Sequence, residues 1–141
     1  MMYLLDTNVV SELRKVSSGR IDANVLRWSR SVPPALCHMS AMSVLELEIG
    51  VRQMERRDAR QGEPLRKWLD GTVLPFFKDR ILPVDLAVVL RFAELSVPDR
   101  RPERDGLIGA TAHVHNMALV TRNVADFEGA GIRILNPWLD P

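Results

Sequence analysis

Met2-Tyr3-Leu4-Leu5-Asp6-Thr7-Asn8 is a short apolar run that stops at a carboxylate and two small hydrogen-bonding residues. Four apolar residues without polar alternation predict a strand buried on both faces, as in a parallel sheet covered by helices. Asp6 would then lie at the carboxyl end of that strand, where open α/β sheets place their ligand crevice. The competing interpretation is that Asp6, Thr7 or Asn8 only caps the helix expected over 9–15.

Length and composition are those of an ordinary soluble protein. With 141 residues, of which 46% are hydrophobic and 26% charged, the chain is expected to form one domain over 1–141. No apolar run approaches the length that spans a bilayer, and 1–5 is too short for a signal peptide, so we expect a cytoplasmic protein without membrane contact. The single cysteine, Cys37, excludes an internal disulfide and is predicted to be a buried thiol.

The overall charge does not mark the chain as a nucleic-acid binder. The net charge is +1, so any affinity for phosphate has to be local. Only Lys15, Lys67 and Lys78 of the 19 basic residues are lysines, and arginine can bind phosphate through two hydrogen bonds at once. A GC-rich coding sequence would produce the same bias, which leaves both explanations open.

Short apolar segments alternate with amphipathic ones along the chain. Helices are expected over 9–15, 21–32, 43–60, 64–77, 86–97 and 103–116, with Gly62 as a helix breaker and Asp85 as an N-cap. Strands are expected over 2–5, 35–40, 81–84, 118–121 and 132–135. This alternation predicts an α/β domain with a mainly parallel central sheet.

A second acid, Asp105, begins a helical face of small and apolar residues. Ile108, Gly109 and Ala112 share its side of the helix, which lets that helix lie close to a sheet and directs Asp105 toward the strand ends. A buried charge of this kind needs a partner. The alternatives are a favourable place in the first helical turn, or an ion pair with Arg101 or Arg104.

A third acid, Glu46, has two interpretations. Ser43-Val44-Leu45-Glu46 matches a capping box, in which Glu46 folds back onto the backbone of Ser43. The same segment follows the second predicted strand, which also puts Glu46 about one turn above a strand end. Glu48 lies on another side of the helix and ranks behind it.

The fourth acidic segment is Thr121-Arg122-Asn123-Val124-Ala125-Asp126-Phe127, directly after a buried strand. Asn123 or Asp126 is positioned to turn toward the same crevice. Such hard oxygen ligands favour Mg²⁺ or Mn²⁺ over zinc. His113 and His115 point to different sides of their helix and His38 stands alone, so the histidines make a poor zinc site.

These segments together resemble one family, the PIN domain, in particular the VapC and FitB type of bacterial toxin-antitoxin nucleases. The resemblance covers almost the whole chain, in the order 4–8, 40–47, 104–112, 119–127 and the final Asn136-Pro137-Trp138. It implies a three-layer α/β/α fold and a cluster of acids that binds Mg²⁺ or Mn²⁺ and cleaves single-stranded RNA to products with 5′-phosphate and 3′-hydroxyl ends.

The resemblance also assigns site residues. By matching positions, Asp6, Glu46 and Asp105 are the metal-site acids. Asp126 is the expected fourth acid, although relatives place an Asp or Asn where Asn123 stands; if neither contributes, the site holds one metal ion rather than two. The supporting residues are Thr7, Ser43, Thr121 and Asn123. The candidate phosphate contacts are Arg100, Arg101, Arg104 and Arg122, whereas Arg56, Arg57 and Arg60 are expected on a solvated helix face.

Partners follow from the same resemblance: a VapB-like antitoxin, an RNA substrate, and a homodimer or toxin-antitoxin hetero-oligomer. Apolar residues available for such interfaces, with core packing as the alternative, are Leu26, Trp28, Leu65 and Trp68. A haloacid dehalogenase would need a second aspartate where Asn8 stands, and a receiver domain would need a lysine at a third strand end. The alternative within the family is a catalytically inactive domain that binds RNA or protein.

Overall fold

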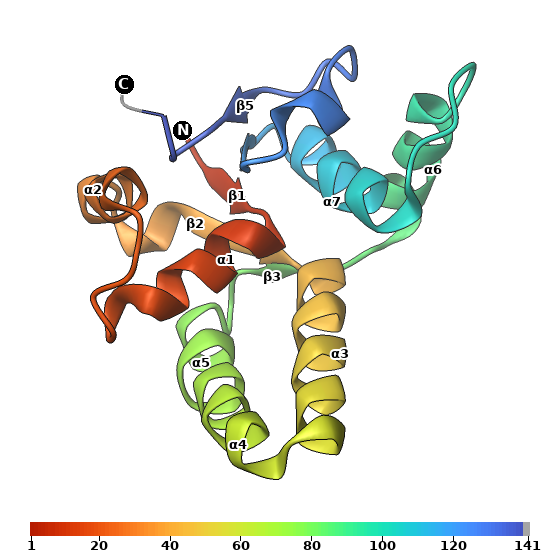
Figure 1. The fold of residues 1–141 in the computed structure, drawn as a ribbon. Coiled ribbons are helices and arrows are strands. Elements are labelled where there is room, and N and C mark those ends of the chain that lie inside the picture. Colours follow the sequence, from red (N-terminus) through yellow and green to blue (C-terminus); the bar gives the residue numbers. More distant parts are fainter. Residues whose placement is uncertain (140–141) are drawn as a thin grey trace.

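A parallel sheet forms the centre of the molecule. The computed structural model describes residues 1–139 and shows five strands in the order β3-β2-β1-β4-β5, every neighbouring pair being parallel (Figure 1). The strands are β1 (Tyr3–Leu5), β2 (Cys37–Ser40), β3 (Ile81–Leu82), β4 (Ala118–Val120) and β5 (Ile134–Leu135). The predicted mainly parallel sheet is confirmed, with strands shorter than the apolar runs at 35–40, 81–84 and 132–135.

Helices cover both faces of this sheet (Figure 1). They are α1 (Thr7–Leu13), α2 (Ala23–Ser31), α3 (Ala41–Arg57), α4 (Ala59–Trp68), α5 (Leu74–Phe76), α6 (Leu86–Leu95) and α7 (Glu103–Val114). Successive residues of β1 show why: Leu4 packs with Ile108 and Ala112 of α7, while Leu5 packs in the other core cluster with Val9 and Val10 of α1. The fold is therefore the predicted three-layer α/β/α arrangement.

Strand register brings the ends of β1, β2 and β4 together. Leu5 pairs with Val120 and Leu4 pairs with His38, and the Asp6 N–H continues the ladder to the Val120 carbonyl at 2.9 Å. Asp6 therefore lies between the residues that follow β2 and β4. Side chains from three distant parts of the sequence meet at this edge of the sheet.

Two predicted helix boundaries are wrong. Gly62 does not break a helix: the break is at Asp58, whose side chain accepts hydrogen bonds from the Arg60 and Gln61 N–H groups at the start of α4. Gly62 lies inside α4 because a Cβ there would approach the Cα of Glu55 on α3 to 2.6 Å. The helix expected over 64–77 is interrupted by a π-helical turn, Leu69–Val73.

Several predictions about burial are confirmed. Cys37 is a buried free thiol. Trp28, Leu65 and Trp68 pack against the core, which is the core role considered for them. Within residues 1–139, no helix combines the length and the hydrophobicity needed to cross a bilayer.

Candidate functional site

Asp6 is a buried carboxylate held by two hydrogen bonds. Its side chain is 3% exposed; Oδ1 accepts from the Thr7 N–H at 2.7 Å and Oδ2 from the Thr121 hydroxyl at 2.8 Å. Asp6 is thus itself the N-cap of α1, so capping and the strand-end position are both properties of one residue. The two bonds use one side of each oxygen and fix the direction of the carboxylate.

The Thr121 hydroxyl connects the segments after β1 and β4. Besides donating to Asp6, it accepts from the Asn123 N–H at 3.0 Å and from the Asn8 side-chain amide at 3.3 Å. Asn8 in turn accepts from the Arg122 N–H at 3.4 Å. Thr121 was predicted as a supporting residue, whereas Asn8 was not among the predicted site residues; it stands next to Thr7, but no local pattern shows that it reaches Thr121.

Glu46 faces Asp6 through one intervening hydroxyl. The Thr7 hydroxyl donates to Glu46 Oε1 at 2.7 Å, so the N-terminus of α1 orients an acid of α3. The capping-box interpretation is wrong because α3 begins at Ala41 and its N-cap is Ser40, which accepts from the Met42 N–H at 3.0 Å. Glu46 therefore lies in the second turn of the helix and is free of capping.

Ser43, predicted as a supporting hydroxyl, is fully buried in the first turn of α3. Within residues 1–139 its Oγ has no hydrogen-bond partner. A buried hydroxyl without a partner costs free energy, roughly 1 to 3 kcal/mol. The position next to Glu46 in the sequence of the site helix is the observation; its hydroxyl does not bond to any of the predicted acids.

Asp105 and Asp126 complete the acidic edge. Asp105 lies in the first turn of α7 and is half-buried, with the buried small-residue stripe Ile108, Gly109 and Ala112 behind it, as predicted. Asp126 is exposed on the 3-10 turn Val124–Phe127, and its backbone N–H donates to the Asn123 carbonyl at 3.2 Å. Asn123 therefore ties Asp126 to the strand end through its main chain.

Mutual repulsion shows that these acids share one electrostatic environment. Burial raises the pKa of Asp6 above its ordinary value, the Thr121 and Thr7 hydrogen bonds oppose this, and the charges of Asp105 and Glu46 add to the rise. Burial also raises the pKa of Asp105, and the charges of Glu46 and Asp126 raise it further. Within residues 1–139 no ion pair joins Asp105 to Arg101 or Arg104, so that alternative is not found.

The donor atoms at this edge are all oxygens of carboxylates, hydroxyls and amides, a set that fits a hard divalent cation. Positive charge would offset the repulsion that raises the pKa of Asp6 and Asp105. In the described chain, however, no three His, Cys, Asp or Glu side chains already form a group able to hold a metal ion. The chemistry of the acids fits such an ion, whereas their side chains are held apart by the Thr7 and Thr121 hydroxyls.

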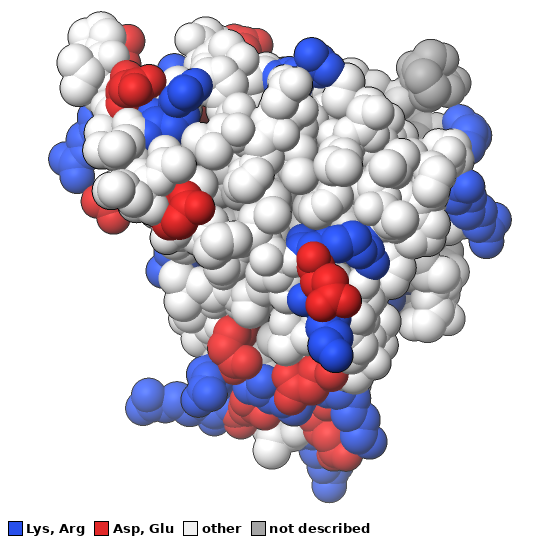
Figure 2. Space-filling model, turned by 180° about the vertical axis from the view of Figure 1, so that it is seen from behind, with Lys and Arg blue, Asp and Glu red and all other residues white. Residues whose placement is uncertain are grey.

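The basic residues near the acids divide into two groups. Arg101 donates to the carbonyls of Leu95, Asp126 and Glu128, and Arg122 lies over the Trp138 ring at 5.2 Å, so both have structural contacts. Arg100 and Arg104 are exposed. Arg56, Arg57 and Arg60 are exposed where α3 meets α4, a region in which basic and acidic side chains intermix (Figure 2). This agrees with a solvated helix face.

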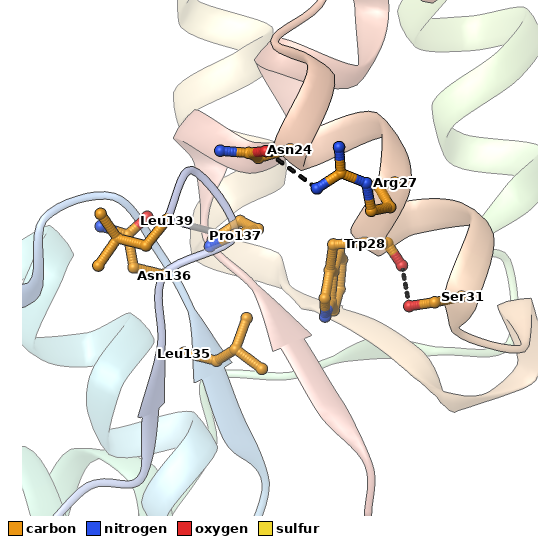
Figure 3. A pocket seen from close by; sticks show the side chains of 8 residues that line it. All are labelled: Asn24, Arg27, Trp28, Ser31, Leu135, Asn136, Pro137 and Leu139. Atoms are coloured by element: carbon orange, nitrogen blue, oxygen red, sulfur yellow. Dashed lines mark hydrogen bonds between the residues drawn. The ribbon is translucent and has the colours of Figure 1, made fainter. Parts of the chain in front are cut away.

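Clefts elsewhere in the molecule do not contain the acids. One of about 270 Å³ separates α2 from the C-terminal segment, and Figure 3 shows Trp28 and Leu135 on its opposite walls. The Asn24 amide donates to the Trp138 carbonyl at 2.8 Å and closes one end of this region. Two other clefts, of about 180 and 430 Å³, lie beside Trp68. None of the three is lined by Asp6, Glu46, Asp105 or Asp126.

Fold and site together define the class of protein. A sequence model of the PIN domain matches residues 3–130, and this chain belongs to the PIN domain family. Its relatives include the VapC ribonuclease Y4jK of Sinorhizobium fredii, 37% identical over 145 aligned residues that cover 97% of this chain and 98% of the relative. Toxin FitB of Neisseria gonorrhoeae is 34% identical, with 99% and 100% covered.

Solved structures agree with this assignment. FitAB bound to the IR36 DNA fragment matches with a TM-score of 0.88 at 30% identity and covers 99% of this chain and 98% of its own. FitAcB from Neisseria gonorrhoeae matches with a TM-score of 0.86 at 32% identity, covering 97% and 99%. The predicted family and fold are confirmed.

Proposed function

We propose that this chain is a PIN-domain ribonuclease toxin that hydrolyses phosphodiester bonds of single-stranded RNA in the cytoplasm with Mg²⁺ or Mn²⁺. The observation that carries the proposal is the convergence of Asp6, Glu46 and Asp105 at one sheet edge, where their charges oppose one another. Groups that destabilise each other in this way gain a role when substrate and cation are present. The relatives named VapC ribonuclease and Toxin FitB support it.

The residues of the chain have distinct tasks in this proposal. Asp6, Glu46, Asp105 and Asp126 would hold the cation, which supplies Lewis-acid stabilisation of the phosphate and a more acidic water. Thr121 and the Thr7 N–H keep Asp6 oriented, and the Thr7 hydroxyl does the same for Glu46. An acid of the cluster that is not used for coordination accepts the proton of the attacking water as the P–O bond to the leaving oxygen breaks.

An antitoxin is part of the proposed function. FitAB and VapBC assemblies are among the solved structures that this chain resembles, so a small protein of the VapB or FitA kind is the expected inhibitor. We expect the product of the neighbouring reading frame to form a complex with this chain and to stop RNA cleavage. Free and complexed protein, compared in the same cleavage assay, test this point.

The central experiment is cleavage of an end-labelled single-stranded RNA by the purified protein. We expect cleavage with Mg²⁺ or Mn²⁺ and none after EDTA. Asp6→Asn should remove activity, because Asn cannot supply a second anionic oxygen. Glu48→Gln is the matched control, since Glu48 lies on the same helix as Glu46 but pairs with Arg66 at 2.7 Å.

Cleavage that survives EDTA, or that persists in Asp6→Asn protein, would contradict the proposal. Folded protein that binds RNA or antitoxin without cleaving under any added metal would instead support the inactive binding domain. That alternative is favoured by one observation: Asn123 contributes its main chain, not an acid, to the site. Asp126→Asn in the same assay tests whether the exposed acid takes its place.

A further inference from the structure

Helix α6 is apolar on nearly all sides but is covered on only one. Its sequence is LAVVLRFAEL, and its extensive contacts in the described chain are with α7. Figure 1 shows it beside α7 at the margin of the molecule. A helix that is apolar all round is normally buried. The outer side of α6 therefore lacks the cover that its composition requires.

The uncovered residues form one stripe. Leu86 is 72% exposed, Leu90 is 55% exposed and Val97, just beyond the helix, is 75% exposed. Val89 and Ala93 are exposed between them at helical spacing. We call Leu86, Val89, Leu90, Ala93 and Val97 the α6 stripe. Contiguous apolar exposure of this kind marks an interaction surface.

We propose that the α6 stripe is the interface with a second copy of this chain, the two α6 helices packing antiparallel about a twofold axis. Such an interface has to be self-complementary, and a continuous apolar stripe satisfies this without any matching pattern on another protein. Neither end of the stripe is apolar, however. The charges at the two ends specify the direction of packing.

Opposite charges stand at the two ends of α6. Asp85 caps its N-terminus by accepting from the Val88 N–H at 3.1 Å and is exposed. At the other end, Arg101 donates to the Leu95 carbonyl at 2.8 Å and so holds the following loop against the helix. The neighbouring Arg100 is exposed, and no hydrogen bond or ion pair within residues 1–139 involves its guanidinium. Antiparallel packing brings Asp85 near Arg100 of the partner subunit.

This interface would also support the acidic edge. Phe92 of α6 packs so closely on Gly106 of α7 that an added Cβ would lie 2.2 Å from the ring. Asp105 is the residue before Gly106. Covering α6 therefore stabilises the helix that carries Asp105, while all four acids still come from one chain.

Light scattering after size-exclusion chromatography tests the interface on the purified full chain without antitoxin. We expect twice the chain mass of 15.9 kDa for the wild type and a single chain mass for Leu86→Glu/Leu90→Glu. The matched control is Val16→Glu, at an apolar residue that is 48% exposed and lies far from α6 in the sequence; it should stay dimeric. Thermal melts followed by circular dichroism verify that each variant is folded.

A monomeric wild type at about 50 μM, far above typical dimer dissociation constants, would overturn the proposal. So would a double variant that remains dimeric, or a stripe that is protected only when an antitoxin is bound.

A charge exchange tests the antiparallel direction. Asp85→Arg and Arg100→Asp should each weaken the dimer about tenfold, and their combination should restore it to within about threefold of the wild type. Because Asp85 also caps α6, the Arg100→Asp variant and the combined variant are the decisive pair. A combination that is as weak as either single change would exclude the antiparallel arrangement.

Discussion

Two glutamates on α3, Glu46 and Glu48, lie two residues apart and meet opposite electrostatic surroundings. Glu46 faces Asp6 and Asp105, and its charge raises the pKa of both. Glu48 accepts hydrogen bonds from Arg66 and Arg52 at 2.7 and 2.8 Å, and these contacts lower its pKa to about 2. One glutamate therefore opposes its neighbours, and the other is held by them.

The difference separates two uses of charge. Around Arg66, which also contacts Glu55 and Asp70, each acid has a cation, and the contacts join α3 to α4. At the sheet edge the acids have hydroxyl and N–H donors but no cation. The first arrangement stabilises the fold. The second costs stability, which is expected of a site that functions through a bound ion and substrate.

The largest expected effect is on catalysis. Asp105→Asn should lower the rate of RNA cleavage at least about 100-fold, because the carboxylate that completes the acidic edge becomes neutral. Glu48→Gln should leave cleavage within about twofold of the wild type. Initial rates with end-labelled RNA at saturating Mg²⁺ provide the measurement. Equal loss in the two variants would remove the distinction between the two groups of acids.

The next effect is on packing of the α3–α4 pair. Gly62→Ala should destabilise the protein by about 2 kcal/mol, because the new Cβ meets backbone atoms of Glu55 that have little room to move. This corresponds to a fall in Tm of about 6 to 8 °C. Gly71→Ala, where an added Cβ meets nothing within 4 Å, is the control and should melt close to the wild type.

Removing the charge of Glu48 should have a smaller effect on stability. Glu48→Gln is expected to cost about 1 kcal/mol at pH 7, since the pair with Arg66 is partly exposed to solvent. The lowered pKa means that the stabilisation is complete above the ordinary pKa of 4.5 and is lost as the pH falls toward about 2. Urea melts of wild type and variant at pH 7 and pH 3 should show the gap narrowing.

The smallest effect has the opposite sign. In metal-free buffer at pH 7, Asp105→Asn should raise Tm by about 2 °C, roughly 0.5 kcal/mol, because it removes one of the repelling charges. The pKa of Asp105 is raised, so its ionised form disfavours the folded state, and the gain should disappear as the pH falls through that pKa. A lower Tm for this variant at pH 7 would show that Asp105 has a structural role instead.

Much of this site was predictable because its signals are local. Apolar runs followed by Asp6 and by Thr121 are visible in the sequence, and the spacing of Asp105 from Ile108, Gly109 and Ala112 shows which helix face it shares. Parallel strands place their carboxyl ends at one edge, so the acids were expected to meet. The family resemblance assigned roles on the same residues.

The tertiary structure decided which donor meets which acid. Thr7 bonds to Glu46, 39 residues away, and Thr121 bonds to Asp6, 115 residues away, because the sheet order places β1 between β2 and β4. The sequence left Ser40 and Ser43 as competing caps, since both precede the same helix. By itself it determined where buried strands end in polar residues. The contacts across the sheet, and the uncovered side of α6, depend on packing between segments that carry no mark of each other.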